Sequence, residues 1–215
     1  MKYQIIYADV PWTYNDDRGR KPGYAGITYP TMKTKDLCEL PVKQIADKDC
    51  VLFMWVTGSM LPDCLKIIHE WGFKFKTTAF VWVKQNPKAG TPVSLIGRYT
   101  MSSCEFVLVG TRGHPKRIRN NVRQLVEAPR TIHSAKPKEV HKRIVDIYGD
   151  IPRIELFARE PVEGWTTIGD GIDSKDIRDA LKEIIDGLGM EACFRIRKIL
   201  RGVIVGSCKV YSSGS

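Results

Sequence analysis

Short apolar runs alternate with polar, glycine-containing segments along most of the chain. Five of the apolar runs are brief, rich in β-branched and aromatic residues, and bounded by turn-forming residues. This pattern is typical of buried strands. The predicted strands are residues 3–8, 50–57, 75–83, 104–110 and 153–158.

Patterns typical of helices lie between these runs. The predicted helices are residues 34–47, with an interruption at Pro41, and residues 59–71, 136–149 and 174–187. Strands that alternate with helices predict an α/β protein with a single, doubly wound, mostly parallel sheet. Such sheets bind ligands at the carboxyl ends of their strands, so Asp9 and the segment after Ala158 are candidate walls of a site.

The charge balance adds a candidate partner. The 34 Lys and Arg residues against 24 Asp and Glu residues give a net charge of +10, which favours a polyanion, nucleic acid first. A soluble basic enzyme without such a partner has the same balance. The chain has no apolar run of about 18 residues, the length that spans a membrane. An aspartate and a proline interrupt the N-terminal apolar segment, so we expect no signal peptide and a cytoplasmic protein.

The six cysteines have neither zinc-ligand nor disulfide-framework spacing, so we expect reduced thiols and no metal site.

The most informative residues are Asp9, Val10, Pro11 and Trp12, directly after the first strand. An exocyclic adenine amine is a poor nucleophile because the ring delocalises its lone pair. Two acceptors on its hydrogens localise that lone pair toward an incoming methyl group. Asp9 offers a side-chain oxygen, Pro11 or its neighbour a backbone carbonyl, and Trp12 an aromatic face for the base. A strand that ends in an Asp-x-Pro turn with a packed tryptophan is the alternative.

These residues resemble the Asp-Pro-Pro-Trp signature of the MT-A family of adenine-amino methyltransferases. The family includes the catalytic subunit of the messenger-RNA adenosine methyltransferase and many bacterial and phage DNA enzymes. Val10 replaces a proline of the family pattern, but Pro11 is retained, so we expect activity to survive. Further matching blocks, in family order, are YPTM (29–32), LFMWVT (52–57), FVWVK (80–84), SAKPKEV (134–140), RIELFAR (153–159) and GWTTIGDGID (164–173).

The resemblance implies a Rossmann-like class I methyltransferase fold, S-adenosylmethionine as the cofactor, and a role for each matched residue. The residues implied in catalysis are Asp9, Pro11, Trp12 and Tyr29. The residues implied in cofactor binding are Asp9, Val10, Lys136, Arg159, Gly169, Asp170 and Gly171. Lys136 is expected at the cofactor's methionine carboxylate and Arg159 near its ribose. Taken alone, these two residues also fit a solvated lysine and an arginine in an ion pair at the rim.

A basic segment, residues 112–130, is the candidate phosphate-binding region. Its expected nucleic-acid contacts are Lys116, Arg117, Arg119 and Arg123, and a solvated loop is the alternative. Trp55, Trp71 and Trp82 are expected in the core rather than against a base.

The resemblance leaves three functions open. The first is methylation of the 6-amino group of adenine in DNA, favoured by the small size of the chain, which is similar to bacterial and phage members. The second is the same reaction on RNA. The third is a catalytically silent nucleic-acid-binding subunit. We expect a methyltransferase domain over residues 1–173 and, over residues 174–215, an extension that packs on it or assembles it into a homodimer or heterodimer.

Overall fold

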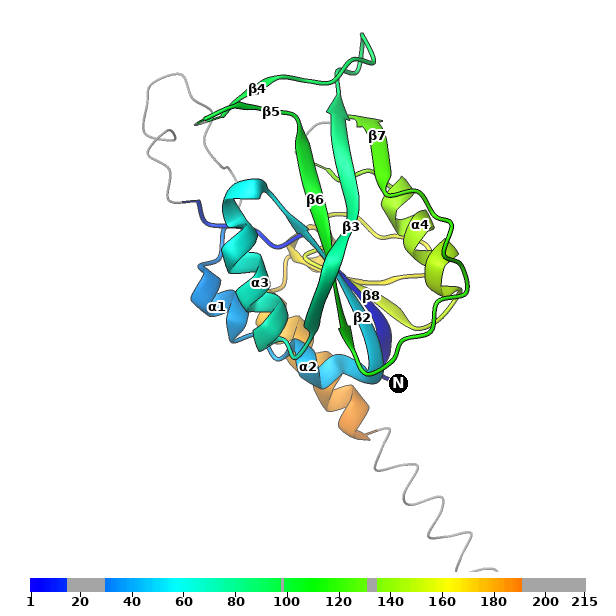
Figure 1. Ribbon diagram of the computed structural model, residues 1–215. Coiled ribbons are helices and arrows are strands. Elements are labelled where there is room, and N and C mark those ends of the chain that lie inside the picture. Colours follow the sequence, from blue (N-terminus) through cyan, green and yellow to red (C-terminus); the bar gives the residue numbers. More distant parts are fainter. Residues whose placement is uncertain (15–29, 98, 131–134, 191–215) are drawn as a thin grey trace, which may run out of the picture.

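The computed structural model describes residues 1–14, 30–97, 99–130 and 135–190 (Figure 1). Within these residues, a seven-stranded sheet has the order β7-β3-β6-β2-β1-β8-β9. Its strands are β1 (Tyr3–Ala8), β2 (Ala46–Val56), β3 (Lys74–Gln85), β6 (Cys104–Arg112), β7 (Leu125–Pro129), β8 (Arg153–Leu156) and β9 (Thr166–Ile168).

One strand, β6, runs against the direction of the others. It pairs antiparallel with β2 and β3, whereas the β1–β2, β1–β8, β8–β9 and β3–β7 pairs are parallel. The β3–β6 connection carries a small hairpin, β4 (Leu95–Ile96) with β5 (Met101–Ser102), instead of the crossover helix that a parallel return requires. The start of β6 therefore lies at the edge where the parallel strands end.

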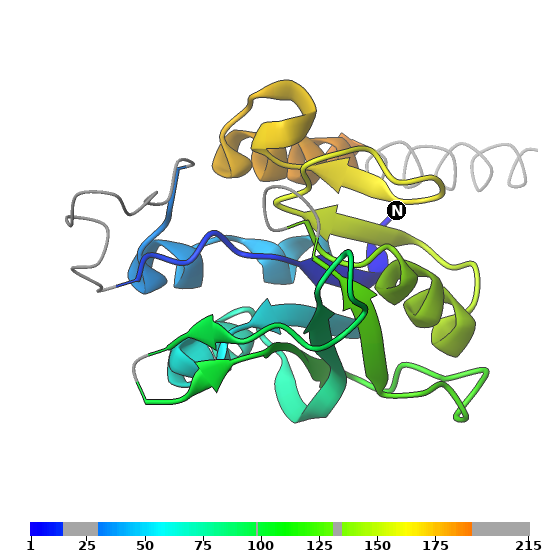
Figure 2. The ribbon, with the colours of Figure 1, turned by 90° about the horizontal axis from the view of Figure 1, so that it is seen from above.

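Helices cover both faces of the sheet, as Figures 1 and 2 show. One face carries α1 (Thr34–Cys38), α2 (Val42–Ile45), the 3-10 helix η2 (Gly58–Met60), α3 (Leu61–Glu70) and the helix over residues 177–190, and the other carries α4 (Glu139–Tyr148). Alternate residues of β1 enter the two cores: Ile6 packs on the first face and Ile5 and Tyr7 on the second. Burial on both faces explains the continuous apolar runs in the sequence.

The predicted α/β fold with a mostly parallel sheet is confirmed, with local differences. Four strands were not predicted. The strands β7 and β9 lie in charged or turn-rich segments and bury few side chains, and β4 and β5 have only two residues each. The predicted helix over 59–71 divides into η2 and α3. Pro41 separates α1 from α2, as predicted.

The described part of the C-terminal segment packs on the first face of the sheet. Ile177 and Leu181 are buried there in the same apolar cluster as Leu37 and Leu52. Residues 191–215 lie outside the described residues, so the predicted division at residue 173 stays a prediction. No helix among the described residues is long and apolar enough to cross a membrane.

Candidate active site at the carboxyl edge of the sheet

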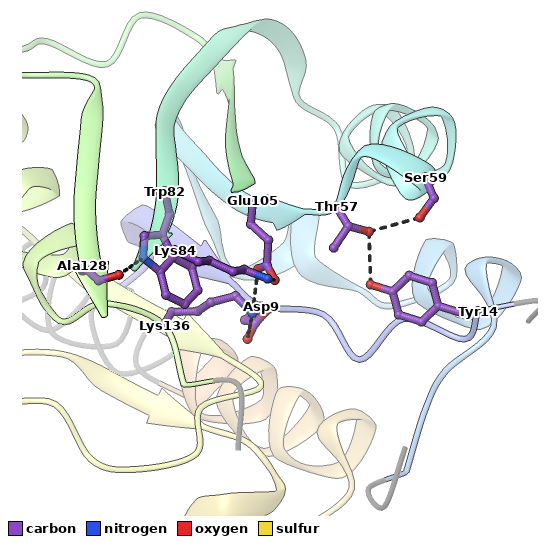
Figure 3. Close-up of polar contacts among 9 residues, drawn as sticks. All are labelled: Asp9, Tyr14, Thr57, Ser59, Trp82, Lys84, Glu105, Ala128 and Lys136. Carbon is purple, nitrogen blue, oxygen red and sulfur yellow. Dashed lines mark hydrogen bonds and ion pairs between the residues drawn. The ribbon is translucent and has the colours of Figure 1, made fainter. Parts of the chain in front are cut away.

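Four charged side chains converge where the parallel strands end (Figure 3). Asp9 follows β1, Lys84 is near the end of β3, Glu105 is the second residue of β6, and Lys136 precedes α4. The antiparallel register pairs Trp82 with Glu105, which sets the carboxylate of Glu105 beside Lys84. The topology thus assembles residues that are far apart in the sequence.

These side chains form an alternating chain of charges. The ammonium of Lys136 lies 3.0 Å from Oδ2 of Asp9 and 3.2 Å from Oε2 of Glu105, and that of Lys84 lies 2.6 Å from Oε1 of Glu105. All four side chains are between 11% and 16% exposed. Charges this buried require partners, and each of them has one here.

The pKa values reflect this pairing. Burial alone would lower the pKa of Lys136, but Asp9 and Glu105 outweigh it and raise that pKa above its ordinary value. Burial alone would raise the pKa of Glu105, but Lys136 and Lys84 lower it. The Lys136 ammonium and the Glu105 carboxylate are therefore both charged near neutral pH. The two ammonium groups of the site also lie over tryptophan rings, Lys136 at 5.5 Å from the centre of Trp55 and Lys84 at 5.4 Å from that of Trp82.

The segment after Asp9 is held in a tight turn. The carbonyl of Val10 accepts a hydrogen bond from the N–H of Trp12 (2.9 Å), and the carbonyl of Pro11 accepts one from the N–H of Met32 (2.8 Å). A carbonyl oxygen has two lone pairs, so each of these two keeps one for a ligand. Either carbonyl can serve as the second acceptor that the sequence predicts.

Trp12 lies differently from what the sequence suggests. Its side chain is only 5% exposed and belongs to the apolar core of the first face, so its ring offers almost no surface to a base. The structure thus favours the packed-tryptophan alternative for Trp12. Trp55, Trp71 and Trp82 are buried in the core, as predicted. Tyr29 lies outside the described residues.

A second group of predicted residues meets beside the end of β1. Ala8 pairs with Leu156 of β8, and Leu156 pairs with Ile168 of β9. The turn that follows β9 then packs on the one that follows β8: a Cβ at Gly171 would lie 2.5 Å from Cα of Arg159. A side chain larger than hydrogen does not fit there. Arg159, Gly169, Asp170 and Gly171 are therefore brought together at the same edge as Asp9.

The predicted phosphate contacts lie elsewhere. The basic segment leaves the end of β6, at the opposite edge of the sheet, and the N–H of Ile118 donates to the carbonyl of Ile147 near the end of α4 (2.7 Å). Lys116, Arg117, Arg119 and Arg123 are all exposed. The structure does not place Lys116, Arg117 or Arg119 beside Asp9, and their binding of phosphate stays a prediction.

Three residues of the site were not predicted: Glu105, Lys84 and Tyr14. The hydroxyl of Tyr14 lies 3.2 Å from that of Thr57, which follows β2 (Figure 3). A signal for Glu105 does exist, because it is the only acidic residue between Glu70 and Glu127 and stands in an apolar strand. Lys84 ends the matching block FVWVK (80–84), although no role was assigned to it, and Tyr14 has no comparable signal in the sequence.

This geometry has a definite chemical capacity. Asp9 presents a buried carboxylate that can accept an N–H of a ligand. Among the described residues, Lys136 directs two of its three N–H donors to Asp9 and Glu105. The third donor can bind an anionic group of a ligand. The site can thus hold an amine and a carboxylate side by side.

Comparisons with known proteins identify the family of this chain. The MT-A70 family model matches residues 3–171. The Type II methyltransferase M.MunI from Mycoplasma sp is 40% identical over 189 residues, which cover 78% of this chain and 77% of the relative.

Two eukaryotic relatives are more distant. The N(6)-adenosine-methyltransferase catalytic subunit METTL3 from Homo sapiens is 25% identical over 83% of this chain, and the MT-A70-like N(6)-adenosine-methyltransferase from Arabidopsis thaliana is 27% identical over 80% of it. The matched region is only 30% and 24% of those two proteins, respectively. The family match over residues 3–171, together with the 40% identity to M.MunI, shows that this chain belongs to the MT-A70 family of methyltransferases.

Proposed function

We propose that this chain transfers a methyl group from S-adenosylmethionine to the exocyclic 6-amino group of adenine in DNA. The observation that carries the proposal is the buried Asp9 carboxylate, which follows β1 and lies 3.0 Å from the Lys136 ammonium. When bound, the cofactor supplies a methyl group on a positively charged sulfur. The residues of the chain position the two reactants and supply no covalent intermediate.

The donor set fits this cofactor. S-adenosylmethionine has an amino acid end with one ammonium and one carboxylate, and the site pairs a carboxylate with an ammonium. Lys136 would bind the carboxylate end with its remaining donor. Arg159 and Asp170, both exposed at the rim, would contact the ribose, and Gly169 and Gly171 would shape the turn beside it.

Asp9 would also orient the target amine. Its carboxylate would accept one N–H of the amine, and the carbonyl of Val10 or Pro11 would accept the other. Both acceptors are fixed before the substrate arrives, since Val10 is buried and the turn is hydrogen-bonded. Fixed acceptors cost little reorganisation during the reaction. Trp12 would support the turn from the core.

DNA is the substrate we favour. The Type II methyltransferase relative is matched over 77% of its length, whereas the adenosine methyltransferases are matched over 30% or less. The silent-subunit alternative is disfavoured because Asp9 and Lys136 are both present and in contact. A nucleic-acid substrate and a cytoplasmic location follow from the proposal.

The test uses Asp9→Ala with Asp186→Ala as the matched control, because Asp186 is exposed on the helix over 177–190. Methyl transfer from labelled S-adenosylmethionine to duplex DNA is measured, and cofactor affinity is measured by calorimetry. We expect Asp9→Ala to lose at least about a hundredfold in turnover, the scale of one preorganised electrostatic contact, and the control to match wild type. Equal turnover in Asp9→Ala and wild type would refute the proposal.

A further inference from the structure

The β4–β5 hairpin stands beyond the sheet at the edge that holds the candidate active site. In Figures 1 and 2 it projects past the ends of β3 and β6, on the side away from α4. Leu95 pairs with Ser102 and Ile96 with Met101. The hairpin therefore forms an arm at the rim of the site.

This arm is attached directly to a site residue. The N–H of Lys84 donates to the carbonyl of Ser103 (2.9 Å), and the N–H of Val93 donates to the carbonyl of Lys84 (2.8 Å). Lys84 also binds Glu105 through its side chain. At the far end, a Cβ on Gly97 would collide with the carbonyl oxygen of Thr100, so a larger residue does not fit at position 97. Backbone hydrogen bonds thus fix the arm relative to the charged cluster.

The arm exposes large apolar side chains. Tyr99 is 94% exposed, Ile96 83% and Met101 55%. Ile96 and Met101 are directly paired across the hairpin, so the two side chains lie side by side. Contiguous exposed apolar groups of this size are typical of a binding surface.

The charge of the arm indicates the kind of partner. Residues 86–104 include Lys88 and Arg98 and no acidic residue. A segment that carries aromatic and aliphatic side chains and only positively charged ionisable residues suits a nucleic acid, whose bases stack on aromatic rings and whose phosphates attract cations. A second copy of this chain is a poorer match, because each copy has a net charge of +10.

We propose that the β4–β5 hairpin is a base-stacking wedge for duplex DNA, with Tyr99 as its principal contact and Ile96 and Met101 beside it. This inference rests on the proposed function. A target adenine inside a duplex must leave the stack before its amine can reach Asp9, which costs a few kcal/mol. Apolar side chains inserted next to the departing base offset that cost.

The test compares methyl transfer to a duplex with transfer to the same target in a single strand. Stacking of one base on an aromatic ring contributes about 1–3 kcal/mol, so Tyr99→Ala is expected to slow methylation of the duplex about 5- to 150-fold. The single strand needs no opening, and its rate is expected to change only a few-fold. Tyr99→Trp keeps a stacking face and is expected to restore the duplex rate.

A second readout needs no turnover. With 2-aminopurine at the target position, binding of wild type to the duplex is expected to raise the fluorescence, and binding of Tyr99→Ala at saturation to raise it much less. Phe75→Ala is the matched control, because Phe75 is 41% exposed at the start of β3, at the opposite edge of the sheet. It is expected to behave as wild type.

Several results would overturn the wedge. These are an equal loss on duplex and single strand, an unchanged duplex rate, or an unchanged 2-aminopurine signal in Tyr99→Ala. A dimer that becomes monomeric in Tyr99→Ala, measured by light scattering, would assign the arm to a protein interface instead. If wild type opens the duplex but methylates no nucleic acid, the proposed function fails while the wedge stands.

Discussion

Replacement of Lys136 by methionine tests the charged cluster as a structural unit. Removal of one partner from a buried ion pair costs about 3–5 kcal/mol. Two features reduce that figure here: about a tenth of each side chain is exposed, and Lys84 still holds Glu105 at 2.6 Å. The unpaired charge is then Asp9, because the Lys136 ammonium, 3.0 Å away, is its ion-pair partner among the described residues. We expect Lys136→Met to lower the free energy of unfolding by about 2–4 kcal/mol.

The assay is urea unfolding followed by tryptophan fluorescence between pH 6 and pH 9. The raised pKa of Lys136 means that its stabilising contribution is fully present below the ordinary lysine pKa of about 10.4 and is lost only above it. The difference between wild type and variant is therefore expected to stay constant over this range. Lys138→Met is the matched control, because Lys138 lies 2.8 Å from Glu160 but is 79% exposed, and such pairs contribute about 0–1 kcal/mol. Equal losses in the two variants, both below about 1 kcal/mol, would show that the Lys136 ion pairs contribute no more than an exposed pair.

Three further predictions address other parts of the molecule. Glu105→Gln should lower stability at pH 7 by about 1–3 kcal/mol. Because the pKa of Glu105 is lowered in the folded state, the stabilisation from its carboxylate is present above about pH 4.3 and is lost as the pH falls through the folded-state pKa. The difference in free energy of unfolding between variant and wild type should therefore shrink in urea titrations toward pH 3. Burial raises the pKa of the Cys50 and Cys64 thiols to about 12, so mass spectrometry should find both unmodified after exposure of the native protein to a thiol reagent at pH 8; rapid modification would contradict their burial. Charge reversal at Arg117 and Arg119 should weaken DNA binding and flatten the dependence of the binding constant on salt concentration. An unchanged dependence in a salt titration would show that these two arginines do not contact phosphates.

The fold could be predicted where burial leaves a trace in the sequence. Strands β1 and β2 are largely buried and contain continuous apolar runs, and β3 and β6 contain shorter ones around Phe80 and Val107. Edge strand β7 fully buries only Val126, and its remaining residues resemble a loop. The reversed direction of β6 has no local signature either, because it depends on how the segment between β3 and β6 returns.

The candidate site divides in a similar way. The resemblance identified Asp9 and Lys136, and the structure brings them into contact. Glu105 and Lys84 join them only through the β3–β6 register, which pairs residues about twenty positions apart. For Trp12 the motif was recognised but the environment was not: the motif suggested a stacking surface for a base, whereas the side chain lies in the apolar core. A motif gives the identity of a residue, and only the packing around it gives its exposure.

The identity of the methylated nucleoside distinguishes the proposed reaction from its alternatives. Three reactions each contain the protein, labelled S-adenosylmethionine and one substrate, which is duplex DNA, single-stranded DNA or RNA. The products are digested to nucleosides and identified by mass, and Asp9→Ala is the blank. We expect 6-methyl-deoxyadenosine from DNA and none from the blank. Methyl-adenosine from RNA alone would contradict the proposed substrate, and no methylated nucleoside from any of the three would contradict the proposed reaction.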